Sequence, residues 1–315
     1  MSDQVYRTYF EAEAEQWMDE SYKGDASVYP TAEHRARIVL RHAGQAGRSL
    51  RIADLGCGGG GVSIPLARAG HTVVGVDRSE AMLELARDST NGQDAEVAAR
   101  LEFKLGDVLD PPVDPESFDM VIAMGLIGYL EDESLLFQVA YKLLADRGEL
   151  LVSCRNRLFN LNSLSWRTRR EFGKDDIDAL LAEMEGCYKP VSNSSLVAFL
   201  ARLDAVVRDL REQLDDQIKS GDDSPASAMV NLFEPAADRI EARQQTPALM
   251  AALAKANGFG MGKVWGVHPH MLDPNANGLL PAGAFVAFSK AMEALDEEPV
   301  SLAWSSVFIG QYVKR

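Results

Sequence analysis

A run of glycines early in the chain has the composition of a ligand-binding loop. Residues 52–61 are Ile-Ala-Asp-Leu-Gly-Cys-Gly-Gly-Gly-Gly, so Gly56, Gly58 and Gly60 follow an apolar segment and lead toward a helix. Because glycine has no Cβ, the backbone there can approach a bound ligand closely. Asp77 comes 21 residues after Gly56, where a carboxylate can accept hydrogen bonds from both hydroxyls of a ribose. These residues predict a site for a ligand that contains a nucleoside.

The glycines alone do not identify that ligand. Gly56, Gly58 and Gly61 also satisfy the dinucleotide fingerprint G-x-G-x-x-G, which is a weak match by itself. Two acids add information. Asp54 stands two residues before the first glycine, in an apolar strand end, where a buried carboxylate needs an ammonium group or backbone amides as partners. Asp107 ends a later strand, at the sheet edge where ligands of open α/β sheets bind.

Short apolar strands alternate with helices in the elements that position these residues. The pattern predicts strands at residues 50–55, 72–77, 101–105, 118–124 and 149–154, and helices at 62–69, 80–88 and 134–145. Two later strands are predicted near 263–268 and at 304–313, with a helix near 285–295 between them. Alternation at this spacing is typical of βαβ units in a parallel sheet, whose crossovers are right-handed.

Together, the ordered motifs resemble those of class I S-adenosylmethionine-dependent methyltransferases of the small-molecule type. The matching segments are Asp-Leu-Gly-Cys-Gly-Gly-Gly at 54–60, Val-Gly-Val-Asp at 74–77, Gly-Asp at 106–107, Phe-Asp-Met-Val-Ile at 118–122 and the fifth strand with its preceding turn at 144–154. The resemblance covers residues 30–155 and the last strand. It implies an α/β, Rossmann-like, doubly wound fold, with a mostly parallel seven-stranded sheet, an antiparallel last strand and a helical cap insertion.

The same resemblance implies a cofactor and the residues that bind it. The cofactor would be S-adenosyl-L-methionine, converted to S-adenosyl-L-homocysteine. The residues carried over are Asp54, Gly56, Gly58, Gly60, Asp77, Arg78, Asp107, Val108, Met124 and, on the N-terminal helix, Arg35. Simpler roles stay open for some of them: Asp77 as a helix cap, Asp107 as a turn residue and Arg35 as a solvated helix residue.

Four regions are expected. Residues 1–48 would form an N-terminal helical lid and 49–156 the cofactor-binding core. A helical cap insertion would occupy 157–245, and 246–315 would complete the core, with a second insertion at 269–300. Within the cap, apolar residues spaced three and four apart at 196–218 predict a helix with one apolar stripe. We expect this stripe to pack into the core of the monomer, and the alternative is that it forms the contact of a homodimer.

Composition and charge limit the partners. The formal net charge is −15, which disfavours nucleic acid, and the fourth strand is followed by Met-Gly-Leu-Ile instead of the Asp/Asn-Pro-Pro-aromatic motif of base methylation. No long apolar run or basic leader is evident, and three scattered cysteines suit a reducing compartment. A cytoplasmic protein that acts on a small molecule, without a membrane or nucleic-acid partner, is therefore expected.

Two histidines are the candidate catalytic groups. His268 and His270 stand at the end of a predicted strand, on the ligand side of the sheet, and residues two apart on a strand face the same way. One of them could remove the proton from a hydroxyl acceptor. With Asp273 they could also bind a metal, but this spacing is not diagnostic, and no metal is predicted.

Basic residues after the fifth strand suggest how an acceptor is held. Arg155, Arg157, Arg167, Arg169 and Arg170 occur in sixteen residues without an acid. A cap surface that pairs with acidic helices explains them simply, whereas the alternative is a site for a carboxylate or phosphate of the substrate. We take Arg155, Arg157 and Tyr129 as the candidate substrate-binding residues.

These features predict methyl transfer to a small molecule, with a hydroxyl oxygen of a saccharide or natural-product intermediate as the acceptor. N-methylation of a small amine is the nearest alternative. A nicotinamide-dependent oxidoreductase and a non-catalytic S-adenosylmethionine-binding protein are the other candidates.

Overall fold

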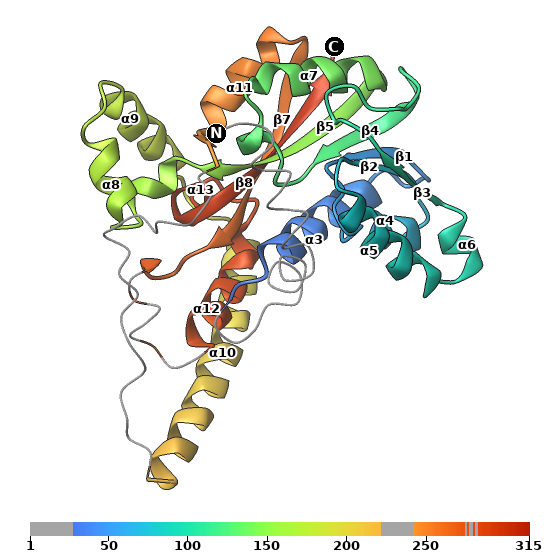
Figure 1. The fold of residues 1–315 in the computed structure, drawn as a ribbon. Coiled ribbons are helices and arrows are strands. Elements are labelled where there is room, and N and C mark those ends of the chain that lie inside the picture. The colour runs from blue at the N-terminus through green and yellow to red at the C-terminus, as the bar shows by residue number, and fades with distance from the viewer. Residues whose placement is uncertain (1–27, 222–241, 275, 277–279, 281–282) are drawn as a thin grey trace.

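The computed structural model describes residues 28–221, 242–274, 276, 280 and 283–315 (Figure 1). The predicted lid aromatics Tyr9, Phe10 and Trp17 lie outside these residues. None of the helices in the described ranges combines the length and apolarity needed to cross a membrane.

One sheet organises the described chain. Its order is β3–β2–β1–β4–β5–β8–β7, with the short strand β6 paired to β5. The strands are β1 Arg51–Leu55, β2 Thr72–Asp77, β3 Leu101–Leu105, β4 Phe118–Ala123, β5 Leu144–Asn156, β6 Gln244–Gln245, β7 Phe259–Pro269 and β8 Ser305–Lys314. Only β8 runs antiparallel to its neighbours, β5 and β7. The predicted mostly parallel sheet with an antiparallel last strand is confirmed; the two-residue β6 was not predicted.

Helices cover both faces of the sheet (Figure 1). On one face, α7 Glu133–Leu143 and α11 Pro247–Ala256 pack over an apolar cluster that includes Phe137, Phe259 and Tyr312. On the other, α3 Thr31–Gly44 and α4 Ser63–Arg68 pack over a cluster that includes Ile38 and Trp265. Successive strand residues point to opposite faces, so β5 contributes to both clusters. Two further helices, α5 Glu80–Asn91 and α6 Ala95–Ala98, follow β2.

Most predicted boundaries agree with the structure within two residues, and two strands are longer. β5 begins at Leu144, directly after α7, where the sequence predicted a helix to residue 145. β7 begins at Phe259 and has a bulge between Met261 and Val264, which breaks the alternation on which the prediction depended.

The remaining helices lie beyond the core strands. They are α8 Trp166–Glu171, α9 Ile177–Cys187, α10 Asn193–Lys219, α12 Ala284–Met292 and α13 Ser301–Trp304. α10 contacts α12 near its N-terminal end and extends away from the other described elements (Figure 1). The expectation that its apolar stripe is buried in the core is wrong, because no residue of α10 is buried.

Candidate cofactor and acceptor site

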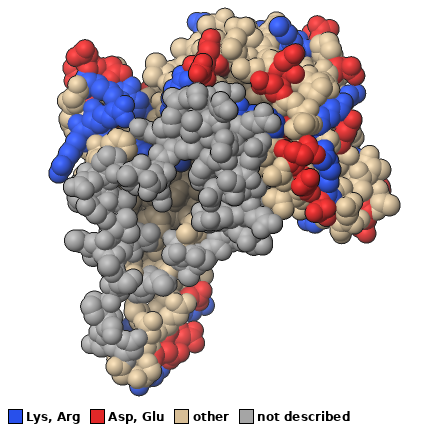
Figure 2. Space-filling model, in the orientation of Figure 1, with Lys and Arg blue, Asp and Glu red and all other residues tan. Residues whose placement is uncertain are grey.

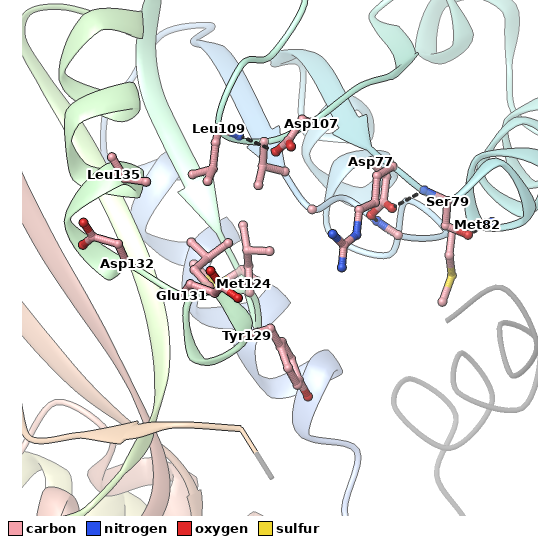
Figure 3. Close-up of a pocket in the computed structure, with 17 residues that line it drawn as sticks. Asp77, Ser79, Met82, Asp107, Leu109, Met124, Tyr129, Glu131, Asp132 and Leu135 are labelled. Carbon is pink, nitrogen blue, oxygen red and sulfur yellow. Dashed lines mark hydrogen bonds between the residues drawn. The ribbon is translucent and has the colours of Figure 1, made fainter. Parts of the chain in front are cut away.

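A cavity of about 430 Å³ opens at the carboxyl ends of β1, β2 and β4. It has the size of a small-molecule site. Figure 3 shows Asp77 and Asp107 on one side of it and Glu131, Asp132 and Leu135 on the other. Its other lining residues include Gly56, Gly58, Arg78, Val108, Met124 and Tyr129. Seven of the ten predicted cofactor-binding residues therefore line one cavity, whereas Asp54, Gly60 and Arg35 do not.

The glycine loop takes a backbone conformation that favours glycine. Gly56, Gly58 and Gly60 have φ values of +75°, +51° and +78°, which strain a residue with a Cβ. The first two line the cavity. Gly60 instead makes room for neighbouring side chains, since a Cβ there would lie 3.1 Å from the Phe103 ring and 3.2 Å from Ile64. Its role in the structure is packing of the loop against the helix that follows.

Asp77 connects the loop to the end of β2. Its Oδ2 accepts a hydrogen bond from the Gly58 N–H at 2.9 Å, and its Oδ1 accepts one from the Ser79 N–H at 2.9 Å. Burial raises the pKa of this carboxyl above its usual range, although these hydrogen bonds oppose the shift. Each carboxylate oxygen can accept a second hydrogen bond, so Asp77 can hold the loop and still bind ligand hydroxyls. A helix-cap role is carried by Ser79, whose Oγ accepts from the Met82 N–H.

Asp54 is buried beneath the loop. Its Oδ2 accepts a hydrogen bond of 2.6 Å from the Ser63 hydroxyl. Burial, with a smaller contribution from the nearby charge of Asp77, raises the pKa of Asp54 to about 7. The partner expected from the sequence was an ammonium group or a backbone amide, and the structure provides a hydroxyl. Asp54 thus supports the loop from below the cavity.

Asp107 and Val108 form the wall next to β3. The Asp107 Oδ1 accepts a hydrogen bond of 2.9 Å from the Leu109 N–H, which is a turn contact, while the side chain also faces the cavity (Figure 3). The turn role and the ligand-lining role are therefore compatible. Apolar residues surround this end of the cavity, namely Val108, Leu109, Leu126, Leu130 and Leu135, which suits a flat heterocyclic ring.

Arg35 reaches the cavity wall from α3. Its Nη1 lies 3.4 Å from the Ser153 Oγ, which also accepts a hydrogen bond of 2.7 Å from the Gly125 N–H. Gly125, a lining residue, has φ +79°, and a Cβ there would lie 2.3 Å from the Arg35 Nη1. Because residue 125 is a glycine, the Arg35 guanidinium can lie directly behind the cavity wall.

The methyltransferase motifs and this cavity fall in a segment that matches a known domain. Residues 52–148 match the family model described as a methyltransferase domain. This segment, with its ordered motifs, is similar to the cofactor-binding domain of class I S-adenosylmethionine-dependent methyltransferases.

Curated relatives agree with this family over part of their length. The ubiquinone biosynthesis O-methyltransferase of Azorhizobium caulinodans is 32% identical over 157 residues, which cover 47% of this chain and 60% of the relative. The protein of the same name from Pseudomonas entomophila is 29% identical over 152 residues, covering 47% and 61%. The chain thus spans about 60% of the length of these two relatives.

Solved structures share the fold of this chain. Magnesium protoporphyrin IX methyltransferase from Synechocystis PCC 6803 with bound SAH has a TM-score of 0.55 at 16% identity, over 100% of both chains. The [4+2]-cyclase SpnF has the same TM-score at 14% identity, over 100% of this chain and 97% of its own. Because a cyclase has a fold as similar as a methyltransferase does, this likeness describes architecture and leaves the reaction to be argued from the site.

The two predicted catalytic histidines, His268 and His270, do not line the cavity. Their rings lie 4.3 Å apart, and the His268 ring also stacks on Tyr29 at 4.4 Å. His268 has a left-handed φ of +55°, and β7 ends at Pro269, so strand alternation is not what brings the rings together. The His268 Nδ1 lies 3.0 Å from the Ser306 hydroxyl. Its Nε2 and both ring nitrogens of His270 are buried and have no hydrogen-bond partner within the part of the chain that the structure describes.

Burial also affects the charge of these histidines. Burial, followed by the nearby positive charges of His270, His34, Arg155 and Arg35, lowers the pKa of His268 well below its usual value. Burial alone lowers the pKa of His270 to about 3. Both rings are therefore neutral near pH 7. Among the described residues, no group of three or more His, Cys, Asp or Glu side chains could hold a metal ion.

The predicted substrate arginines have different environments. The Arg157 guanidinium contacts the Glu171 carboxylate at 2.7 Å and the Asp176 carboxylate at 2.6 Å. This is the simpler of the two interpretations, a cap arginine that pairs with acids, and it leaves Arg157 unsuited to bind an anion. Figure 2 shows the basic side chains of this region, over α8, beside acidic ones. Arg155, by contrast, is exposed at the carboxyl end of β5.

Arg155 has the better position for a substrate. It lies two residues after Ser153 on β5, so both point to the sheet face that α3 covers, where Arg35 contacts Ser153. Its charge contributes to the lowered pKa of His268, which places it near that ring. Among the described residues, none forms a hydrogen bond or ion pair with the Arg155 side chain. Tyr129 lines the cavity and projects from the 3₁₀ turn after β4 (Figure 3).

Several lining residues were not predicted. They are Ser79, Met82, Leu109, Gly125, Leu130, Glu131, Asp132 and Leu135. Leu126, which the resemblance placed with Met124 near the sulfonium, also lines the cavity. Most of the unpredicted residues follow directly after β2, β3 or β4, so their position at the carboxyl ends of strands was the available signal. The chemistry of Leu130 or Leu135 gives no such signal, because a leucine beside a ligand and a leucine in the core have the same sequence pattern.

Proposed function

We propose that this chain transfers a methyl group from S-adenosylmethionine to a hydroxyl oxygen of a small molecule. The observation that carries the proposal is the cavity lined by Gly56, Gly58, Asp77 and Asp107, inside the segment that matches a methyltransferase domain. The names of the curated relatives, O-methyltransferases of ubiquinone biosynthesis, support oxygen as the acceptor atom and give no support to a saccharide.

The residues present fit the cofactor. Asp77 offers carboxylate oxygens to ribose hydroxyls, and the apolar wall around Val108 and Leu109 accepts a heterocyclic ring. The Arg35 guanidinium, behind Gly125, is a partner for the carboxylate of the methionine part. When bound, S-adenosylmethionine supplies a methyl group on a positively charged sulfur, which an oxygen lone pair can attack in line.

The contribution of the protein to the rate is mainly position. The loop, β2 and β4 are buried, hydrogen-bonded elements, and a rigid site that holds both reactants in line can supply much of the acceleration. We propose that Tyr129 and Arg155 contact the acceptor, with Arg155 binding a carboxylate or phosphate on it. His268 and His270 are the candidates for a general base, and the burial of their free nitrogens counts against that role.

Titration calorimetry of ligand-free protein tests the cofactor. We expect S-adenosylmethionine to bind and NAD not to bind, with binding lost in Asp77→Ala. Release of S-adenosylhomocysteine is then measured with phenolic, sugar and amine acceptors. Turnover with amines alone would show that the acceptor atom is nitrogen and not oxygen. Binding without turnover on every acceptor would favour a non-catalytic binding protein, and binding of NAD alone would favour the oxidoreductase.

A further inference from the structure

The surface of α10 has apolar residues that the described structure leaves open. Six large apolar side chains of this helix, with exposed fractions between 39% and 66%, are Leu196, Val197, Leu200, Val207, Leu214 and Ile218. Monomeric proteins seldom expose a continuous apolar strip of this kind. A helix also depends on tertiary packing of its apolar face for most of its stability. The strip therefore indicates a surface that another element covers.

The contact with the rest of the chain uses a different side of α10. The Arg202 Nη1 donates a hydrogen bond to the Lys290 carbonyl of α12, and the Ser192 hydroxyl donates one of 2.7 Å to the Glu298 carboxylate. The residues of α10 that are half-buried are Ser195, Phe199, Leu203, Val206 and Leu210, which follow one another at spacings of three and four. These form the side toward the body, and the exposed strip lies beside it around the helix.

The exposed strip has the spacing of a coiled-coil seam. Val197, Leu200, Asp204, Val207, Arg211, Leu214 and Ile218 alternate at intervals of three and four residues, which is the pattern by which two helices interlock. The seam contains two charges of opposite sign, Asp204 and Arg211. Asp204 has a salt bridge of 2.7 Å with Arg208 on its own helix, but both side chains are more than 70% exposed, so this pair is weak.

The position of these charges selects the partner. Asp204 and Arg211 lie at equal distances on either side of the point between Val207 and Arg208, and Val197 and Ile218 do too. A two-fold axis at that point makes two α10 helices antiparallel. It sets Asp204 beside Arg211 of the partner subunit and Val197 beside Ile218 of the partner subunit. A parallel pair in register would instead place each charge against its own copy, which is unfavourable.

We infer that this chain forms a homodimer through an antiparallel pair of α10 helices, with two symmetric Asp204–Arg211 ion pairs across the axis. An isologous two-fold contact of this type closes on itself and is the commonest arrangement of soluble oligomers. The inference is independent of the proposed function, because no α10 residue lines the cofactor cavity.

Sedimentation velocity over a concentration series tests the dimer. We expect a species of twice the 34.4 kDa of one chain. Val207→Asp, next to the axis, should weaken association on the order of 100-fold, and Asp204→Arg or Arg211→Asp alone on the order of tenfold. The double variant D204R/R211D should recover the wild-type constant within about threefold, because the pair is restored with exchanged signs. Asp209→Arg is the matched control: it makes the same charge change on the other side of the helix and should leave association unchanged.

Other outcomes would overturn the inference. A wild-type chain that sediments as a monomer up to about 100 µM, far above the dissociation constants of stable dimers, would do so. A dimer that Val207→Asp leaves intact would show that another surface associates. Weakening by D204R and R211D without recovery in the double variant would exclude the antiparallel register. Circular dichroism of each variant confirms that α10 is still helical.

Discussion

Buried polar groups lie at both ends of the same sheet edge, and their hydrogen bonding differs between the two ends. At the β1–β2 end, Asp54 and Asp77 are hydrogen-bonded, to Ser63 in one case and to the backbone of Gly58 and Ser79 in the other. A cavity opens beside them. At the β7 end, three ring nitrogens of His268 and His270 have no hydrogen-bond partner among the described residues, and neither side chain lines the cavity.

The difference shows how to recognise a ligand site among buried polar residues. Burying a polar group costs stability unless it is hydrogen-bonded. At the β1–β2 end, hydrogen bonds that also shape the cavity offset this cost. The carboxylate oxygens of Asp77 can still accept further hydrogen bonds, and a ligand can supply them. At the β7 end the rings contact aromatic side chains: Tyr29 stacks on His268, and Phe159 and Phe285 lie against His270 in tilted and edge-on arrangements. That environment stabilises neutral imidazole and gives a ligand no access.

The largest effect is expected for Asp77→Ala. Loss of the carboxylate removes two charged hydrogen bonds to a ligand, each of about 1.5–3 kcal/mol, so S-adenosylmethionine affinity should fall about 100-fold. Calorimetry measures it, with thermal unfolding as a check that the loop survives. Asp107→Ala, an exposed acid on the same cavity, is the matched control and should change affinity by less than about tenfold. Equal losses of affinity in the two variants would show that Asp77 contributes no more to S-adenosylmethionine binding than Asp107 does.

Asp54→Asn should change how stability depends on pH. The pKa of Asp54 is about 7 in the folded chain, against a usual value of 3.8. The folded state then holds the proton more tightly between these values, so folding loses stability as pH rises through this window. Asparagine does not titrate. Between pH 5 and pH 8 the variant should therefore gain about 2 kcal/mol relative to wild type, as measured by urea unfolding. A constant difference across that range would mean that Asp54 is ionised in the native chain throughout.

His270→Phe should show the opposite pH dependence at the other end of the sheet. The pKa of His270 is about 3 when folded, against 6.5 normally. Unfolded chains bind the proton first as pH falls below 6.5, so wild type loses stability in acid, by about 1.4 kcal/mol for each pH unit. Because the unfolded histidine is only half protonated at pH 6.5, the variant should lose about 1 kcal/mol less than wild type between pH 6.5 and 5.5. Measuring both chains at pH 7.5 separates the packing effect of the substitution. Identical acid sensitivity would show that His270 is not buried as a neutral ring.

The same contrast explains what the sequence could predict. The positions of the strands and the glycine loop were predictable, because strand periodicity and glycines such as Gly56 depend on local backbone requirements. The exposure of α10 was not, since a stripe that faces a core and one that faces solvent have identical spacing. The pairing of Arg157 with Glu171 and Asp176 depends on how the cap folds. The left-handed backbone at His268 likewise has no signal in the residue type.

Arg155→Ala tests a residue between the two ends. If Arg155 binds an anionic group of the acceptor, its loss should raise KM about tenfold for an acceptor such as 3,4-dihydroxybenzoate, since a charged hydrogen bond contributes about 1.5–3 kcal/mol. KM for catechol, which lacks the carboxylate, and the affinity for S-adenosylmethionine should not change. Arg169→Ala, an exposed arginine on α8, is the matched control. A KM that rises equally for both acceptors would count against anion recognition.

The smallest effect is expected for His268→Gln, and it bears most directly on the comparison. A general base contributes on the order of 100-fold or more to a proton transfer. The Nε2 of His268 is buried, its Nδ1 faces the Ser306 and Thr31 hydroxyls, and the residue does not line the cavity. We therefore expect kcat to change by less than about threefold, with the pH profile of kcat unmoved. A 100-fold loss that removes the acid limb of that profile would instead make His268 the base, and the two ends of the sheet edge would then form one active site.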